Sequence, residues 1–357
     1  MHPSVLTSLT STMVAAIATP LAGAADNPRE LGAVHWARDL DSALAQAKAC
    51  DKPVMLLFQE IPGCDGCQMF GDQPLSHPLL VEAIETLFVP VAIHNNKPGY
   101  DAQVLARFDE PASNYPVMRF LNAAGKDIVP RQDQIYSVHD VAKRLIETLA
   151  TADRAVPEYL RIAMIESEAR RDHREGLTFA MHCFWEGQAS LGAIDGVIST
   201  TAMFYDKQEA VEVVFDPTIV SIEELVAAAD KAQCATNVYA HGDVQLVHAR
   251  QVVGDRASAA KSRASAAPSK DQDYWLAQSA YRWLPLTPMQ RTKVNAALHL
   301  ETDANSFLAP SQIALVKEIE QALAQDPNAL AGLKPSETVD EMSAYAGQLR
   351  KRLATPH

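Results

Sequence analysis

The first third of the chain alternates between short apolar runs and helix-like spacings of apolar residues. The run 54–58 is apolar throughout and follows Pro53, which predicts a strand buried on both faces. Further strands are expected at 88–93 and 117–121, helices around 79–87 and 102–108, and a closing amphipathic helix along Val138, Val141, Leu145 and Leu149. This alternation predicts one compact α/β domain over residues 33–150.

A second unit is expected over residues 176–325, after a charged, helical connector at 151–175. Alternating apolar positions predict strands around 177–181 and 211–215. The segment 221–224 is a Ser-x-x-Glu capping box, which predicts the start of a helix.

Two later segments have different patterns. Residues 255–272 are rich in Ala, Ser and Lys without an apolar period, which predicts a solvated linker or a surface insertion. Residues 326–357 are expected to form a helical tail.

Charge and hydropathy narrow the class of protein. The chain has 31 Lys and Arg against 44 Asp and Glu, a formal net charge of −13, which argues against a nucleic-acid partner. No apolar run is long enough to span a bilayer, so a soluble mature chain is expected.

The N-terminal residues 1–24 carry no Lys, Arg, Asp or Glu. They contain the apolar stretch 13–18 and then Ala22, Gly23 and Ala24, whose small first and third residues fit a signal peptidase site. We expect a signal peptide and therefore export to the periplasm or beyond the cell, where disulfides persist. A disordered N-terminus is the alternative.

The strongest chemical motif is Cys64-Asp65-Gly66-Cys67, directly after the buried strand 54–58. If it opens a helix, the helix N-terminus stabilises the thiolate of Cys64, which makes it the nucleophile, and Cys67 resolves the mixed disulfide. Half of a zinc site and a purely structural disulfide are the alternatives. A zinc site of this type needs a second ligand pair, and the sequence has no second Cys-x-x-Cys, so no metal is assigned.

Residues 33–150 resemble the thioredoxin fold in their strand, loop and Cys-x-x-Cys order. Tyr115-Pro116 stands where that family has a cis-proline beside the active site, so the resemblance implies that Pro116 binds a peptide substrate. The segment 61–63, Ile-Pro-Gly, departs from the Trp of many thioredoxins. With Cys64 it is similar to the motif of the VPGU-type thioredoxin-like proteins.

A second set of motifs follows in the second unit. It comprises Cys-Phe-Trp at 183–185, Gly-Val at 196–197, Glu-Ala-Val at 209–211, Phe-Asp-Pro at 215–217 and Pro-Leu-Thr-Pro-x-Gln at 285–290. Their order and type resemble peptide methionine sulfoxide reductase A over about residues 176–300. The resemblance implies an α+β domain with a helical C-terminal extension.

That resemblance also implies roles for individual residues. Cys183 would attack the sulfoxide sulfur, Phe184 and Trp185 would form an apolar cage for the methyl group, and Glu209 would protonate the oxygen. Attack leaves a sulfenic acid on Cys183 that a second thiol must resolve, and Cys234 is the other cysteine of this unit. A buried small residue on the helix 222–234 is the alternative for Cys234.

Departures from the reductase pattern concern the substrate side chains. His182 replaces the family's glycine, and the segment that carries a substrate-binding tyrosine is shortened. Tyr205 is a candidate substitute, and Tyr274 is the candidate for the family's second tyrosine, with Tyr281 as its competitor.

Together these features predict an exported oxidoreductase without a cofactor. Its thioredoxin-like domain would supply electrons to a methionine sulfoxide reductase A-like domain, at the high effective concentration that a tether gives. The expected partners are a peptide or protein carrying methionine sulfoxide or a disulfide, and an upstream thiol reductant, which can be membrane-bound. The alternatives are a thiol–disulfide oxidoreductase whose second domain only binds peptide, and a thiol-based metal binder or sensor.

Overall fold

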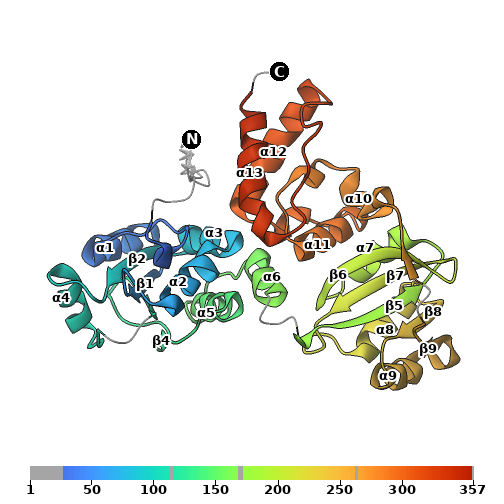
Figure 1. The fold of residues 1–357 in the computed structure, drawn as a ribbon, viewed down its shortest axis with the longest axis horizontal. Helices are drawn as coiled ribbons and strands as arrows, with labels where there is room; N and C mark the ends of the chain where they lie inside the picture. The colour runs from blue at the N-terminus through green and yellow to red at the C-terminus, as the bar shows by residue number, and fades with distance from the viewer. Residues whose placement is uncertain (1–26, 113–115, 168–171, 262–263, 356–357) are drawn as a thin grey trace, which may run out of the picture.

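The computed structural model describes residues 27–112, 116–167, 172–261 and 264–355. The expected signal peptide at 1–24 lies outside these residues. Figure 1 shows two sheet-containing domains, with the helix α6 (Glu158–Glu166) between them and further helices above. No helix of the described residues is long and apolar enough to cross a membrane.

The first domain has a four-stranded sheet in the order β2-β1-β3-β4, in which β1 runs parallel to β2 and antiparallel to β3. Its strands are β1 (Val54–Gln59), β2 (Val89–His94), β3 (Val117–Leu121) and β4 (Gln132–Asp133). Its helices are α1 (Leu40–Cys50), α2 (Asp65–Asp72), α3 (Pro78–Leu87), α4 (Tyr100–Arg107) and α5 (Val138–Thr151).

Strand β1 is buried along its whole length because both faces of the sheet are covered. Met55 and Leu57 face one apolar cluster, with side chains of α3 and α5. Leu56 and Phe58 face the other cluster, with side chains of α1 and α4. Successive residues of a strand point to opposite faces, so a helix-covered sheet requires this continuous apolar run.

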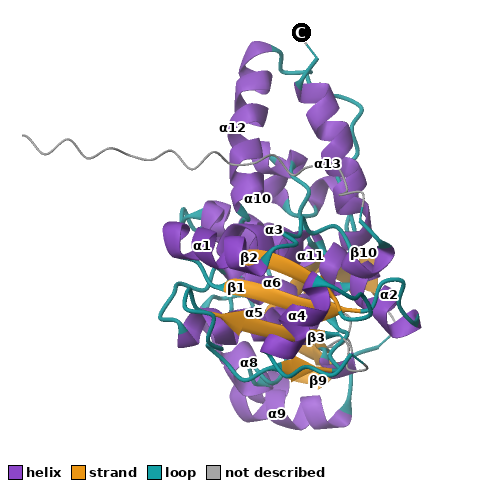
Figure 2. Cartoon of the chain, turned by 90° about the vertical axis from the view of Figure 1, so that its left-hand side faces the viewer, coloured by secondary structure: helices purple, strands orange, loops and turns teal. Residues whose placement is uncertain are grey.

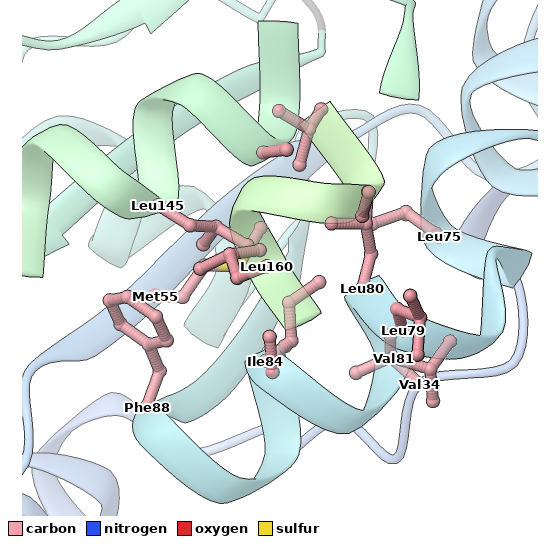
Figure 3. Close-up of a cluster of buried hydrophobic side chains, with 14 of the residues drawn as sticks. Val34, Met55, Leu75, Leu79, Leu80, Val81, Ile84, Phe88, Leu145 and Leu160 are labelled. Carbon is pink, nitrogen blue, oxygen red and sulfur yellow. The ribbon is translucent and has the colours of Figure 1, made fainter. Parts of the chain in front are cut away.

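The connector packs into the first domain. Four residues of α6, among them Tyr159 and Leu160, are buried in the cluster of Met55 and Leu145, and Figure 3 shows Leu160 among these side chains. The helix α6 is therefore part of the first core as well as the link to the second unit.

The second domain has a six-stranded sheet in the order β10-β6-β7-β5-β8-β9, antiparallel except for the β8 and β9 pair. Its strands are β5 (Glu175–Ala180), β6 (Val197–Tyr205), β7 (Gln208–Phe215), β8 (Asn237–Ala240), β9 (Ala257–Ala259) and β10 (Ala264–Ala266). Its helices are α7 (Phe184–Gly192), α8 (Ile222–Lys231) and α9 (Asp243–Val253), and α8 begins at the expected capping box.

The segment 255–272, expected to be a solvated linker or a surface insertion, contains two short strands. This segment supplies β9 and β10, which form the two edges of the second sheet. The side chains of β10 are exposed, so no apolar period marks the strand in the sequence. Pairing of backbone groups with a sheet edge needs no apolar side chain.

The C-terminal helices are α10 (Tyr274–Ala277), α11 (Pro288–His299), α12 (Pro310–Gln325) and α13 (Val339–Leu353). They share an apolar cluster of their own, and Figures 1 and 2 show α12 and α13 projecting away from the two sheets.

Two carboxylates from the N-terminal side bind the first turns of these helices. Glu166 of α6 accepts the Met289 amide of α11 at 2.9 Å, and Glu82 of α3 accepts the Ser311 amide of α12 at 3.0 Å. Negative charge is favoured at a helix N-terminus, so these contacts help to fix the C-terminal helices on the first domain.

Candidate active sites

The Cys-x-x-Cys pair lies where β1 leads into α2. Cys64 is the N-cap of α2 and is exposed, whereas Cys67 is one turn further in and fully buried. The two sulfurs are 3.5 Å apart and both thiols are free. A small movement would close this pair into a disulfide, because both sulfurs belong to the same helical turn.

The two thiols differ in acidity. The backbone amide of Cys67 donates to the Cys64 sulfur, and this lowers the pKa of Cys64 below its ordinary value. Burial, with a smaller contribution from hydrogen bonding to Cys64, raises the pKa of Cys67 to about 12. The exposed thiol is therefore the one that ionises first, which suits a nucleophile.

Polar groups outside the Cys-x-x-Cys motif hold this loop. Glu30 is buried, and its carboxylate accepts the Gly63 amide at 2.7 Å. The side chain of Gln59 donates to the carbonyls of Glu30 at 3.0 Å and Cys67 at 3.3 Å. Gln59 was detectable as a polar residue at the end of an apolar strand, whereas nothing near the motif indicates Glu30, which is 34 residues before Cys64 by number.

Pro116 is buried directly before β3. Because Val117 pairs with Phe58, Pro116 lies beside the carboxyl end of β1, where the loop that carries Cys64 begins. The peptide bond from Tyr115 to Pro116, expected to be cis, lies outside the described residues.

The second site lies between β5 and α7. Cys183 is half-buried and is the N-cap of α7. The carboxylate of Glu209, on β7, accepts the backbone amide of Phe184 at 2.9 Å. Glu209 therefore lies at the N-terminus of the same helix, beside the residue that follows Cys183.

Aromatic rings surround this position. Phe184 and Trp185 have centroids 6.1 Å apart, and Tyr274 of α10 stacks on Trp185 at 4.2 Å with an interplanar angle of 18°. Phe204 of β6 packs edge-on against Phe184 at 5.6 Å. Three of the predicted residues thus come together from two distant segments, and Phe204, which no sequence motif indicates, joins them.

The assignment of Tyr205 to this site is wrong. Tyr205 follows Phe204 in β6, so its side chain points to the opposite face of the sheet. There it stacks on Tyr239 at 3.9 Å and is buried with Met203 and Ala210. The alternation of β6 places Phe204, rather than Tyr205, on the face of Phe184.

Cys234 is buried in the core of the second domain, beyond the end of α8. Burial raises its pKa, a hydrogen bond with Ser190 opposes this, and the charges of Glu186 and Cys183 add to the rise. Ser190 is the seventh of the nine residues of α7, so Cys234 packs beside the later part of this helix, whereas Cys183 lies at its start.

Known proteins resemble parts of this chain. Residues 35–123 match the sequence model of a family described as thioredoxin-like. Similar solved structures include the DsbH oxidoreductase, at 20% identity over 35% of this chain and 90% of that chain with a TM-score of 0.29. A thioredoxin from Thermus thermophilus is 25% identical over 32% of this chain and 85% of that chain, with a TM-score of 0.28.

A third solved structure is methionine sulfoxide reductase A of Corynebacterium diphtheriae, at 19% identity over 32% of this chain and 80% of that chain with a TM-score of 0.27. No curated protein matches the chain. The expected fold class, an α/β domain followed by a mixed sheet-and-helix unit, is confirmed. The family match over 35–123 identifies the domain that carries Cys64 and Cys67 as thioredoxin-like.

Proposed function

We propose that this protein is a thiol oxidoreductase in which the Cys64–Cys67 dithiol donates electrons and the Cys183 site reduces methionine sulfoxide. The observation that carries the second part is the Glu209 carboxylate on the Phe184 amide, next to Cys183 and beside aromatic rings. A nucleophile, a proton donor and an apolar cage for a methyl group are what this reduction needs.

The reaction proceeds in balanced steps. The sulfur of Cys183 attacks the sulfoxide sulfur while Glu209 delivers a proton to the oxygen, which releases methionine and leaves Cys183 as a sulfenic acid. A second thiol displaces water from the sulfenic acid and forms a disulfide. Cys64 then attacks that disulfide, and Cys67 completes the exchange, so that two electrons leave the dithiol as a new disulfide. An upstream thiol reductant restores the pair.

Electron transfer between the two sites requires a movement of the domains or an encounter with a second copy of the chain. The helices α2 and α7, which begin at the two nucleophiles, lie on opposite sides of α6 in Figure 1. The apolar cluster of the first domain also contains Ile198 of β6 and Met289 of α11, so buried contacts hold the two domains in this arrangement. Transfer from Cys64 to Cys183 therefore requires either separation of the domains or an encounter between two chains.

A crosslinking experiment tests this transfer. In Cys67→Ser, a mixed disulfide formed by Cys64 cannot be resolved, so a link to Cys183 or Cys234 should accumulate under mild oxidation and be identified by peptide mapping. Cys64→Ser is the matched control and should form no such link. If Cys67→Ser gives no crosslink within or between chains, the two sites work independently.

Turnover of a methionine sulfoxide peptide with dithiothreitol tests the chemistry of the second site. Glu209→Gln should slow turnover by about 10²–10⁴-fold, the usual contribution of a general acid, and Cys183→Ser should abolish it. Glu212→Gln is the matched control, because Glu212 lies on the same strand but its side chain faces the other side of the sheet. Full turnover in Glu209→Gln would contradict the mechanism.

A second candidate is supported by the stacking of Tyr274 on Trp185 at 4.2 Å, which covers one face of the indole ring and leaves less of it open to a methyl group. In that case the second domain binds peptide without reducing it, and the first domain is the oxidoreductase. The wild type would then show no sulfoxide turnover, while Cys64-dependent reduction of a disulfide substrate such as insulin would persist.

Export to the periplasm or beyond remains part of the proposal, supported by the sequence of residues 1–24.

A further inference from the structure

The carboxylate of Glu60 lies close to the two thiols of the first domain. The donor atoms of Glu60, Cys64 and Cys67 all lie within 4.8 Å of one another. Among the residues that the structure describes, they form the one group of three or more His, Cys, Asp or Glu side chains this close together. Neither the family match nor the proposed redox reaction assigns a role to Glu60.

The three donors sit on a firmly held piece of backbone. Glu60 directly follows β1, Cys64 directly precedes α2, and the loop between them is anchored by the Gly63 amide on Glu30 at 2.7 Å. Cys64 is exposed and Glu60 is partly exposed, so an ion can reach the group from solvent. Because the backbone already holds the donors close together, little conformational entropy would be lost when they bind an ion.

The donor set selects a class of metal. Two thiolates and one carboxylate suit a borderline-soft divalent cation such as Zn²⁺, whereas Mg²⁺ and Ca²⁺ take oxygen ligands. Two sulfurs that are each about 2.3 Å from a tetrahedral zinc ion lie about 3.8 Å apart. The observed separation of 3.5 Å is within a few tenths of an ångström of this value. We infer that the reduced protein binds one Zn²⁺ through Glu60, Cys64 and Cys67, with water in the fourth position.

Zinc binding and the redox reaction then exclude each other. Binding converts both thiols to thiolates and releases two protons, without any change in oxidation state. Formation of the disulfide consumes both sulfur ligands, so the oxidised protein lacks the site. Zinc therefore holds the pair reduced and blocks its nucleophile, which makes the first domain responsive to the supply of zinc.

Calorimetric titration of the reduced full-length protein with ZnCl₂, without oxygen, tests the inference. We expect one ion per chain, and about two protons released when the heats in buffers of different ionisation enthalpy are compared. Removal of the exposed Cys64 in Cys64→Ser should abolish this binding without disturbing the core. Glu60→Gln should weaken zinc affinity by at least about 10-fold. Loss of a group that only hydrogen-bonds to a metal ligand already costs about 10-fold or more, and Glu60 would be a ligand itself.

Matched variants separate this site from other thiols and carboxylates. Asp65→Asn removes the carboxylate next to Cys64 that is outside the donor group, and it should bind zinc like the wild type. Cys183→Ser should also bind normally, whatever the activity of the second domain. The inference is overturned if the reduced wild type binds no zinc, if Glu60→Gln binds as tightly as the wild type, or if binding depends on Cys183.

Discussion

The different environments of Cys64 and Cys67 predict strongly selective labelling by an alkylating reagent. At pH 7 a thiol with the ordinary pKa of 9.0 is ionised to about 10⁻², and Cys64, whose pKa is lower, is ionised to a greater extent. Cys67, with a pKa of about 12, is ionised to about 10⁻⁵. The reactive thiolate is thus at least about 10³-fold more abundant at Cys64.

Intrinsic nucleophilicity offsets part of this advantage. A thiolate of higher pKa is the stronger nucleophile, with a Brønsted coefficient of about 0.5, so a difference of 3 pKa units returns about 30-fold to Cys67. A net preference for Cys64 of at least about 30-fold remains, and the complete burial of Cys67 increases it.

The assay is brief exposure of the reduced protein to iodoacetamide at pH 7, followed by peptide mass mapping. Cys50 is exposed and serves as an internal reference for an accessible thiol. Cys67→Ser should keep the fast reaction at Cys64, whereas Cys64→Ser should leave Cys67 almost unlabelled. Comparable labelling of Cys67 and Cys64 in the wild type would refute the reasoning from burial and hydrogen bonding.

Three further predictions concern stability, each measured by denaturant unfolding. Burial disfavours the ionised form of Glu166 and raises its pKa from 4.5 to about 6. The free energy of unfolding of the wild type should therefore fall by up to about 2 kcal/mol as the pH rises through this interval. Glu166→Gln keeps an acceptor and should remove that loss, and unchanged pH dependence would contradict the assignment. Glu82→Ala removes the acceptor at the start of α12 and should cost about 0.5–2 kcal/mol, whereas Glu82→Gln should cost less. In Gly71→Ala the new methyl would lie 1.9 Å from the Arg29 carbonyl, and about 1–3 kcal/mol should be lost, while Gly242→Ala, with open space around it, should show no steric cost.

Local patterns determined much of the first domain. The apolar run 54–58 became β1 because a strand covered on both faces needs apolar residues at every position. The Cys-x-x-Cys motif then fell at the start of α2, and its spacing alone placed both thiols on one helical turn. The capping box at 221–224 likewise marked the start of α8, because its hydrogen bonds are made within four residues.

The tertiary structure decided which side chains meet. Phe204 and Tyr205 are neighbours in the sequence, and only the twist and packing of the second sheet settle which of them faces Phe184. Pairing with β8 and β6 made residues 257–259 and 264–266 into two edge strands, and this backbone interaction leaves no apolar signal in the sequence. The approach of Glu60 to both thiols, and the support of their loop by Glu30, depend on how the loop after β1 folds back. Sequence spacing specifies contacts within one element, whereas contacts between elements are set by packing, and the proposed chemistry of both sites depends on contacts of the second kind.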